Sequence, residues 1–299
     1  MAINPIFDKS GPIVFFGSGP VAAKSLYFIS KHFQIEAIIT KAVPEYHKGI
    51  APVEELAKKL GIITYFANSK SEIDELFNHH HFISRLGILV DYGVIVSENI
   101  IKSFELGILN SHFSLLPQWR GADPITFSLL SGQQKTGVSL MIIEPTMDTG
   151  KIIVQKSLKI NKTDTTPLLT DKLIDLSNQL LEQYVPMYLS GNIKPRRQPH
   201  PDRATYSRKL TKNDGLIDAN KPAHQLECEV RAYSGWPKSY TKFNNKDIII
   251  TKAHVSKIAD TILDIQCQDS QYLIIDELIA PSGKKMSAIN FLNGYNQEK

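Results

Sequence analysis

The strongest constraint on the fold is a change of pattern close to residue 190. Before that point, short apolar runs alternate with segments in which apolar residues recur at helical spacing. The first apolar run covers 12–16, ends at Gly17-Ser18-Gly19 and is followed by an amphipathic segment over 21–33. Apolar strands that alternate with helices are typical of an α/β domain, in which helices cover both faces of a parallel-rich sheet.

The same alternation continues as far as residue 189. Further strands are predicted over 34–40, 62–66, 88–93, 107–112 and 137–143. Helices are predicted over 51–61, 98–104, 125–132 and 168–189. The last of these helices is expected to close the first domain.

The C-terminal part has a different pattern of short strands broken by Asn, Asp and Gly. These strands are predicted over 241–255, 262–268 and 272–279, with one helix over 225–234 beside them. Many short strands with turn residues between them predict a small antiparallel barrel of the oligonucleotide-binding type. We therefore expect a first domain over 1–188, a linker over 189–206 and a second domain over 207–299.

The linker region is basic and contains several prolines. Pro195, Pro199 and Pro201 favour an extended chain over a helix. Between residues 194 and 212, Asp202 is the one acidic residue, and the basic residues are Lys194, Arg196, Arg197, Arg203, Arg208, Lys209 and Lys212. Such a segment is either a solvated spacer or a cationic track for a polyanion, and both interpretations stay open on charge alone.

Composition limits the class of protein. The chain has 299 residues, of which 42% are hydrophobic and 21% charged, close to the average for globular proteins. No apolar run approaches the roughly 18 residues of a membrane span, and the N-terminal segment lacks the apolar core of a signal peptide. The two cysteines, Cys228 and Cys267, fit a reducing compartment and cannot form a Cys-only zinc site. We therefore expect a cytoplasmic protein without a membrane partner.

The glycine loop after the first strand formally matches the G-x-G-x-x-G/A pattern of dinucleotide sites. Gly17, Gly19 and Ala22 occupy its three fixed positions. A dinucleotide site also needs an acidic residue at the end of the second strand to bind the ribose. Here that strand ends at Thr40-Lys41, and Glu36 lies inside it. The sequence therefore favours a tight turn of an α/β sheet over a dinucleotide site.

The most informative stretch for chemistry is 107–125. Asn110 and His112 lie two residues apart at the end of a predicted strand, so their side chains leave the same face. The carboxyl ends of parallel strands are where open α/β sheets bind ligands. An amide can donate to a developing oxyanion, and an imidazole can move protons near neutral pH. The turn 144–150 follows the next strand and can bring Asp148 beside His112.

Each of these three residues also has a purely structural interpretation. Asn110 and His112 can form a hydrogen-bonding pair at a strand end, and Asp148 can be the Asx residue of a turn. However, the sequence contains neither a G-x-S-x-G nucleophile turn nor an H-E-x-x-H helix. An Asn/His/Asp set without a nucleophile predicts direct transfer to an amine rather than a covalent acyl-enzyme.

The sequence resembles the folate-dependent formyltransferases in several motifs that follow one another in order. These are F-G-S-G at 16–19, D-Y-G at 91–93, N-S-H-F-S-L-L-P at 110–117, W-R-G-A-D-P-I at 119–125, M-D-T-G at 147–150, R-A-Y-S-G-W-P at 231–237 and G-K-K-M-S at 283–287. The resemblance implies a Rossmann-like catalytic domain that uses 10-formyltetrahydrofolate rather than a dinucleotide. It also implies a C-terminal barrel that binds tRNA.

Within this family, the two-domain layout with a basic linker is most similar to the members that formylate methionyl initiator tRNA. By that resemblance Asn110, His112 and Asp148 are the catalytic residues. The folate site is implied at Tyr92, Gly93, Ser114, Leu115, Leu116 and Pro117. The implied tRNA contacts are Lys41, Lys48, Arg120, Lys194, Arg196, Arg197, Arg203 and Arg208. No metal is implied, and a monomer is expected.

The implied reaction transfers a formyl group from 10-formyltetrahydrofolate to the α-amine of methionyl initiator tRNA. Asn110 and protonated His112 would stabilise the oxyanion, and Asp148 would orient His112 and assist proton transfer. The sequence departs from the family at Asp91 and Asp123, where small residues are usual, and in a weakly basic loop after the second strand. Two alternatives remain: a formyltransferase for an amino-sugar nucleotide, and a catalytically silent RNA-binding relative.

Overall fold

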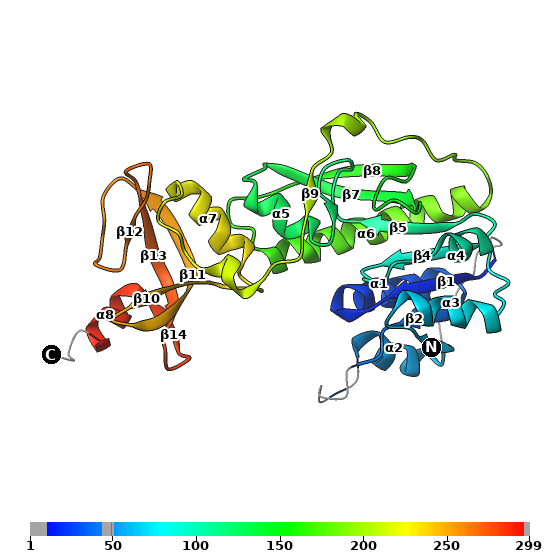
Figure 1. The fold of residues 1–299 in the computed structure, drawn as a ribbon, viewed down its shortest axis with the longest axis horizontal. Helices are drawn as coiled ribbons and strands as arrows, with labels where there is room; N and C mark the ends of the chain where they lie inside the picture. Colours follow the sequence, from blue (N-terminus) through cyan, green and yellow to red (C-terminus); the bar gives the residue numbers. More distant parts are fainter. Residues whose placement is uncertain (1–10, 44–48, 50, 296–299) are drawn as a thin grey trace. The chain divides into compact units, whose positions relative to one another are not determined.

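The computed structural model describes residues 11–43, 49 and 51–295. The chain divides into two compact units, each with a sheet of its own (Figure 1). Unit 1 comprises the residues up to 124 together with 137–158 and 171–206. Unit 2 comprises 125–136, 159–170 and the residues from 207 onward.

Unit 1 contains the larger sheet, whose strand order is β3-β2-β1-β4-β5-β7-β8. Its strands are β1 (Ile13–Gly17), β2 (Ile35–Thr40), β3 (Thr64–Phe66), β4 (Leu86–Val90), β5 (Ile108–His112), β7 (Lys135–Ile142) and β8 (Ile152–Lys159). Its strands are connected by α1 (Gly19–His32), α2 (Pro52–Leu60), α3 (Lys70–His79) and α4 (Glu98–Ser103). α5 (Pro124–Leu130) precedes β7 in the chain and falls mostly in unit 2, and α6 (Thr166–Leu189) follows β8. This element order confirms the predicted α/β architecture.

The central strands are apolar on both faces because helices cover both. All five residues of β1 are buried. Val14 and Phe16 on one face pack with Ile73 of α3 and with Ile100 and Phe104 around α4. On the other side, α1 contacts β1 and β4. This two-sided burial explains why β1 reads as a continuous apolar run rather than an alternating one.

Strand direction in this sheet changes between β5 and β7. β1 pairs in parallel with β2 and β4, β2 with β3, and β4 with β5. β7 is antiparallel to β5, with Asn110 opposite Met141 and His112 opposite Ser139. The carboxyl end of β5 therefore lies inside the sheet, next to the carboxyl end of β4 on one side.

The segment after α6 is attached to unit 1 by backbone hydrogen bonds. Arg196 and Ile152 exchange two of them, with N–O distances of 2.8 and 2.7 Å. Further along, a 3-10 helix (Pro201–Arg203) precedes β9 (Tyr206–Ser207), which pairs with β6 (Arg120–Gly121). Between α6 and β9 the predicted linker therefore contains no α-helix, as its prolines favour, but Pro201 begins the 3-10 helix rather than an extended stretch.

Unit 2 is built on a five-stranded antiparallel sheet. β10 (Ser239–Phe243) and β11 (Lys246–Ser256) form a hairpin whose two turn residues, Asn244 and Asn245, both have positive φ. This conformation is characteristic of a tight two-residue turn and explains the Asn-Asn break in the sequence. β12 (Ile265–Gln266) and β14 (Lys285–Ser287) pair with opposite ends of β13 (Tyr272–Ile279).

The core of unit 2 lies between this sheet and two helices. α7 (Ala223–Ala232) contributes Leu226 and Val230, and α8 (Ala288–Tyr295) contributes Phe291. Within the described residues no strand ladder joins β10 to β12 or β14, so the sheet is a half-barrel. The expected second β-domain is confirmed in this form.

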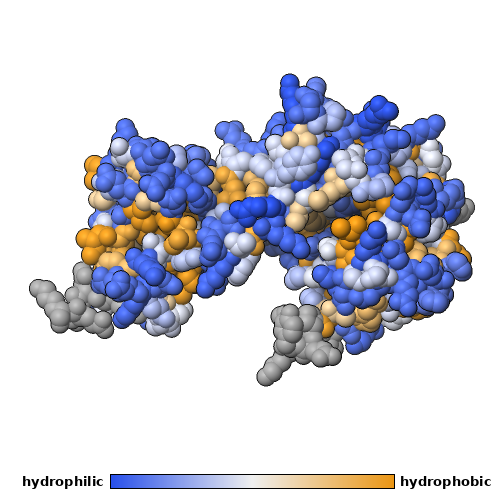
Figure 2. Space-filling view, in the orientation of Figure 1, coloured by the Kyte–Doolittle hydropathy of each residue, from blue (hydrophilic) through white to orange (hydrophobic). Residues whose placement is uncertain are grey.

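Hydrophilic residues predominate on the face drawn in Figure 2, with smaller hydrophobic areas on each unit. None of the helices in the described part of the chain is both long and apolar enough to cross a bilayer.

Candidate active site

The predicted strand-end residues lie on β5 as expected. Asn110 and His112 are two residues apart on an extended strand, which places both side chains on the same face of the sheet. Asn110 is half-buried and His112 is only 6% exposed. In the described part of the chain, the Asn110 side chain makes no hydrogen bond, so its amide is available to a ligand.

His112 is held in one tautomer by a backbone carbonyl. Its Nε2 lies 3.0 Å from the carbonyl oxygen of Trp119, which can only accept a hydrogen bond. The proton of the neutral ring is therefore on Nε2, and Nδ1 is left as a base. Burial lowers the pKa of His112 below its ordinary value, while the charge of Asp148 and the Trp119 carbonyl act in the opposite direction. The neutral ring is therefore the favoured form in the free protein.

Asp148 lies beside His112, as the turn after β7 predicts. Its Oδ2 is 3.9 Å from Nδ1 of His112, which is too long for a hydrogen bond but close enough to stabilise an imidazolium. The same oxygen accepts a hydrogen bond of 2.7 Å from the backbone N–H of Gly121. Asp148 has a φ of +53°, in the left-handed region that Asp tolerates better than most residues.

The turn that carries Asp148 requires glycine at its last position. A Cβ on Gly150 would lie 1.7 Å from the carbonyl oxygen of Ile142, so no larger residue fits there. The backbone of Gly150 thus lies directly against the end of β7, which gives a physical reason for the glycine in the M-D-T-G sequence.

The residues predicted to bind folate follow β4 and β5. Gly93 has a φ of +72° with open space where a Cβ would be. Tyr92 is 1% exposed and its hydroxyl donates to the Ala67 carbonyl, so its side chain belongs to the core and its backbone alone can meet a ligand. After β5, the Ser114 hydroxyl donates to the Gln118 carbonyl. That bond closes a turn around Leu115, Leu116 and Pro117, of which Leu115 is half-buried and the other two are buried.

Asp91 and Asp123, at which the sequence departs from the family, are close enough in space to interact. The pKa of Asp91 is raised, first by desolvation of its carboxyl and second by the negative charge of Asp123, while Lys41 acts in the opposite direction. Asp91 follows β4, where its carbonyl oxygen accepts hydrogen bonds from the backbone and hydroxyl of Ser18. The glycine loop is therefore tied to the end of β4, as a tight turn of the sheet would be.

The predicted cationic residues differ in exposure and in their partners. Lys194, Arg196, Arg197 and Arg203 are exposed, and within the described residues their side chains form no ion pair. Arg120 is 7% exposed and donates from Nη2 to Oε1 of Gln198 at 2.7 Å, which makes it an internal residue. Arg208 is paired with Asp214 through both carboxylate oxygens, and this pair lowers the pKa of Asp214. Lys41 is half-buried, and Lys48 lies outside the described residues.

Sequence reasoning missed the residues that surround the Asn110, His112 and Asp148 set. The Trp119 carbonyl and the Gly121 N–H act through the backbone, which no side-chain pattern reveals. Gln198 donates from Nε2 to the carbonyl oxygens of Asp148 and Gly150 at 2.7 and 3.0 Å. Its only signal in the sequence is a neutral polar residue within a basic run.

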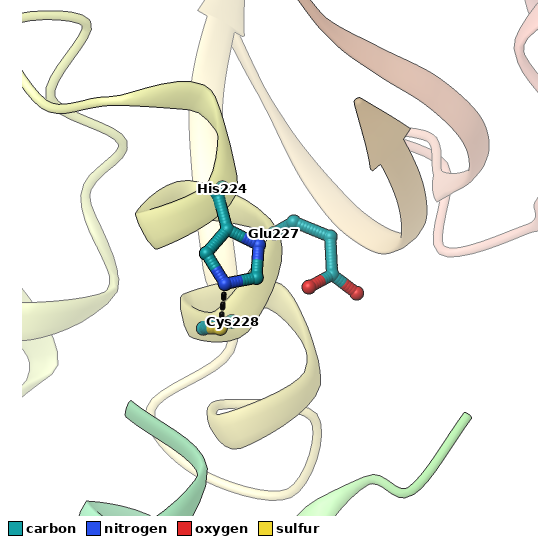
Figure 3. A group of neighbouring side chains, drawn as sticks. All are labelled: His224, Glu227 and Cys228. Atoms are coloured by element: carbon teal, nitrogen blue, oxygen red, sulfur yellow. Dashed lines mark hydrogen bonds between the residues drawn. The ribbon is translucent and has the colours of Figure 1, made fainter. Parts of the chain in front are cut away.

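A second cluster of potential ligands lies on α7, where His224, Glu227 and Cys228 occupy one turn (Figure 3). The carboxylate of Glu227 is already bound by Arg231, at 2.6 Å from Nε and 3.0 Å from Nη2. Nη2 of Arg231 also lies 3.4 Å from Sγ of Cys228, whose pKa is raised by burial. A guanidinium and a protonated thiol leave this cluster without net negative charge for a cation, so we assign it a structural role.

Comparison with known proteins places this geometry in a family. A model described as "Formyl transferase" matches residues 36–185, and one described as "Formyl transferase, C-terminal domain" matches residues 209–296. The chain belongs to the formyl transferase family. This confirms the resemblance drawn from the motifs and the two-part organisation that they implied.

Full-length relatives support the same assignment. This formyl transferase is 31% identical over 311 residues to the methionyl-tRNA formyltransferase of Francisella tularensis subsp. mediasiatica, covering 96% of each chain. It is 29% identical over 300 residues to the methionyl-tRNA formyltransferase of Myxococcus xanthus, covering 95% of each.

Solved structures share the fold at lower identity. The N-formyltransferase of Helicobacter canadensis, in complex with folinic acid and dTDP-3-aminofucose, has a TM-score of 0.65 at 18% identity, covering 91% of this chain and 97% of that one. The phosphoribosylglycinamide formyltransferase of Bacillus halodurans has a TM-score of 0.52 at 23% identity and covers 61% of this formyl transferase and 97% of its own chain.

Proposed function

We propose that this formyl transferase moves the formyl group of 10-formyltetrahydrofolate to the α-amino group of methionyl initiator tRNA, the modification used in translation initiation. One observation carries the choice of acceptor. The relatives matched over 95–96% of both chains, at 29–31% identity, are named methionyl-tRNA formyltransferase. The solved sugar N-formyltransferase is 18% identical, and its likeness concerns the fold alone.

The groups near the carboxyl ends of β4 and β5 fit the proposed co-substrate. The Asn110 amide has no side-chain partner among the described residues, and Gly93, after the adjacent strand β4, has open space where a Cβ would be. The backbone around Tyr92 and Gly93, together with the turn from Ser114 to Pro117, would hold the folate. When bound there, 10-formyltetrahydrofolate supplies the formyl group.

The catalytic residues then divide the chemistry between them. The Asn110 amide donates to the negative charge that develops on the formyl oxygen, as oxyanion donors do in acyl transfer. A free α-amine has a pKa near 8, so part of it must lose a proton before it can attack. Nδ1 of His112 accepts that proton, because the Trp119 carbonyl holds the other proton on Nε2. Asp148, 3.9 Å from Nδ1, stabilises the imidazolium that results. As the oxyanion collapses and the bond from the formyl carbon to the folate nitrogen breaks, the imidazolium would return its proton to that nitrogen, which restores the neutral ring.

This assignment changes one detail of the expected mechanism. By the family resemblance, His112 is expected to be protonated when it stabilises the oxyanion. Because burial lowers the pKa of His112, we propose that the ring starts neutral and becomes protonated during the reaction. Asn110 is then the principal group that stabilises the oxyanion.

The tRNA is proposed to contact the exposed linker cations Lys194, Arg196, Arg197 and Arg203. They lie exposed on one short stretch of chain, which suits a phosphate backbone, and such contacts position a nucleic acid without reading its bases. Arg120 is buried and bound by Gln198, and the exposed Arg208 is paired with Asp214. We therefore leave both out of the proposed phosphate contacts.

A formyl-transfer assay with two competing acceptors tests the proposal. The protein is given 10-formyltetrahydrofolate with methionyl initiator tRNA and an amino-sugar nucleotide side by side, and products are identified by mass spectrometry. Formylmethionyl-tRNA is the expected product. If only the sugar nucleotide is formylated, the acceptor is an amino-sugar nucleotide and the proposed acceptor is wrong. If neither acceptor is formylated, the result favours a catalytically silent RNA-binding protein. Asn110→Ala is the control that assigns any activity to this site.

A further inference from the structure

Gln198 stands out in the linker because it is buried. From Lys194 to Arg203 every residue is exposed except Pro195, which is half-buried, and Gln198, which is 7% exposed. A long polar side chain loses rotamer entropy and hydration when it is buried, so it is retained inside a protein only where hydrogen bonds compensate. The linker therefore directs one neutral side chain into unit 1, at a position that follows the exposed Arg196 and Arg197 and precedes Pro199.

The amide of Gln198 is fully satisfied by the active-site turn. Nε2 donates to the carbonyl oxygen of Asp148 at 2.7 Å and to that of Gly150 at 3.0 Å. Oε1 accepts from Nη2 of Arg120 at 2.7 Å. Both N–H groups and the carbonyl of one amide are thus used, and two of the three bonds hold the turn that carries Asp148.

Hydrogen bonds hold both the backbone and the side chain of Asp148. The backbone carbonyl of Asp148 is held by Gln198, while its Oδ2 accepts from the N–H of Gly121. Gly121 follows Arg120, which Gln198 also binds, and Arg120 follows Trp119, whose carbonyl fixes the His112 ring. A single side chain therefore connects the turn after β7 with the segment 119–121.

The backbone at Asp148 also needs support. Its φ of +53° is a conformation that costs free energy for a residue other than glycine, and it persists only where the surroundings hold it. Hydrogen bonds to the carbonyls of Asp148 and Gly150 restrain the turn on both sides of Thr149. Without them, Asp148 could relax and carry its carboxylate away from His112.

We propose that Gln198 is a positioning residue for catalysis: it fixes Asp148 beside His112 through hydrogen bonds from the linker. This inference rests on the proposed function of Asp148. The linker thereby has two roles on opposite faces, since its exposed arginines meet the acceptor while its buried glutamine maintains the catalytic geometry.

Replacing Gln198 by methionine distinguishes a role in positioning Asp148 from a role in filling the buried space. Methionine has a similar length and volume but cannot donate, so the buried site stays filled while the bonds to Asp148 and Gly150 are lost. We expect kcat to fall by about 10²-fold, the effect of a misplacement of about 1 Å at a catalytic group, with the KM for methionyl-tRNA within about twofold of wild type. Gln179→Met, the same change at an exposed position of α6, is the matched control.

A second variant covers the case in which Gln198→Met fails to fold. Gln198→Glu keeps an acceptor for Arg120 but presents oxygens to the carbonyls of Asp148 and Gly150. It should lose kcat to a similar extent. If the Met variant folds and turns over like wild type, or if the Glu variant does so, Gln198 only fills space and the proposal is overturned.

Amide hydrogen exchange at Gly121 gives a readout that does not depend on activity. Its N–H donates to Asp148 Oδ2, so its protection reports where that carboxylate lies. We expect exchange at Gly121 to become at least about tenfold faster in Gln198→Met and to stay unchanged in Gln179→Met. Unchanged protection would overturn the positioning role. A wild-type protein that formylates neither acceptor would instead contradict the proposed function, while the exchange result would still decide whether Gln198 holds Asp148.

Discussion

Arg196 and Arg197 provide the sharpest test of the acceptor. Both side chains are exposed, and within the described residues neither forms an ion pair. The backbone of Arg196 is fixed to Ile152 by two hydrogen bonds, so replacing both side chains by alanine should leave the path of the linker unchanged. We therefore expect the double variant to change RNA binding without changing the fold.

The expected size of this effect follows from counterion release. Each neutralised phosphate contributes roughly 0.7 to 0.9 to the slope of log affinity against log salt concentration, depending on whether the strand is single or paired. Two lost contacts should therefore flatten the slope by about 1.4 to 1.8. Binding should weaken for every tRNA sequence alike, because phosphate contacts carry no sequence information.

The measurement is a salt titration of tRNA binding by wild type and the double variant. Arg208→Ala is the matched control, since the Arg208 guanidinium is already neutralised by Asp214 and should change the slope by much less than one unit. Formyl transfer to a tRNA-free methionine ester at saturating concentration should hardly change in the double variant. Parallel titration lines for wild type and double variant would refute the reasoning and leave the linker as a spacer.

Three further predictions concern the catalytic residues. Asn110→Ala should lower kcat by roughly 10²–10³, the usual cost of an oxyanion donor, and a rise in the folate KM alone would make Asn110 a binding residue. His112→Ala should lower single-turnover transfer by about 10²–10⁴ while folate binding persists, and a rate near wild type would remove His112 from the mechanism. Asp148→Asn should lower the pKa of His112 further, because the carboxylate charge now raises it, and should leave a stable but nearly inactive protein. An NMR titration of the His112 ring checks the direction of that shift, and an active variant would make Asp148 a turn residue only.

Local sequence patterns identified the helices and strands with a clear apolar pattern and missed those without one. The apolar run of β1 and the helical spacing of α1 are both confirmed. α3 (Lys70–His79) has only three apolar residues, Ile73, Leu76 and Phe77, in an otherwise polar segment, which are too few to stand out in the sequence. β8 (Ile152–Lys159) is buried only at its first two residues, and its exposed end lacks the alternation that reveals a strand.

Strand direction and the closure of a sheet are tertiary properties. The alternation of strands and helices predicts a parallel-rich sheet, and β1 to β5 are parallel as expected. The antiparallel pairing of β7 with β5 is set by the partner strand, which no residue pattern of β7 records. Likewise, the short strands of unit 2 predict a barrel, whereas the pairing of β12 and β14 with β13 leaves a half-barrel within the described residues.

The sequence by itself determined which candidate catalytic groups come together, through residues at fixed short spacing. Asn110 and His112 share a strand face because successive side chains alternate, and the turn after β7 contains Asp148 wherever that strand lies. Only the tertiary structure decided how these groups are held. The Trp119 carbonyl, the Gly121 N–H and Gln198 reach the site from segments whose approach depends on the whole fold. Backbone groups are the same at every residue, and a buried glutamine looks like any other polar residue until its surroundings are known, so their roles are visible only in three dimensions.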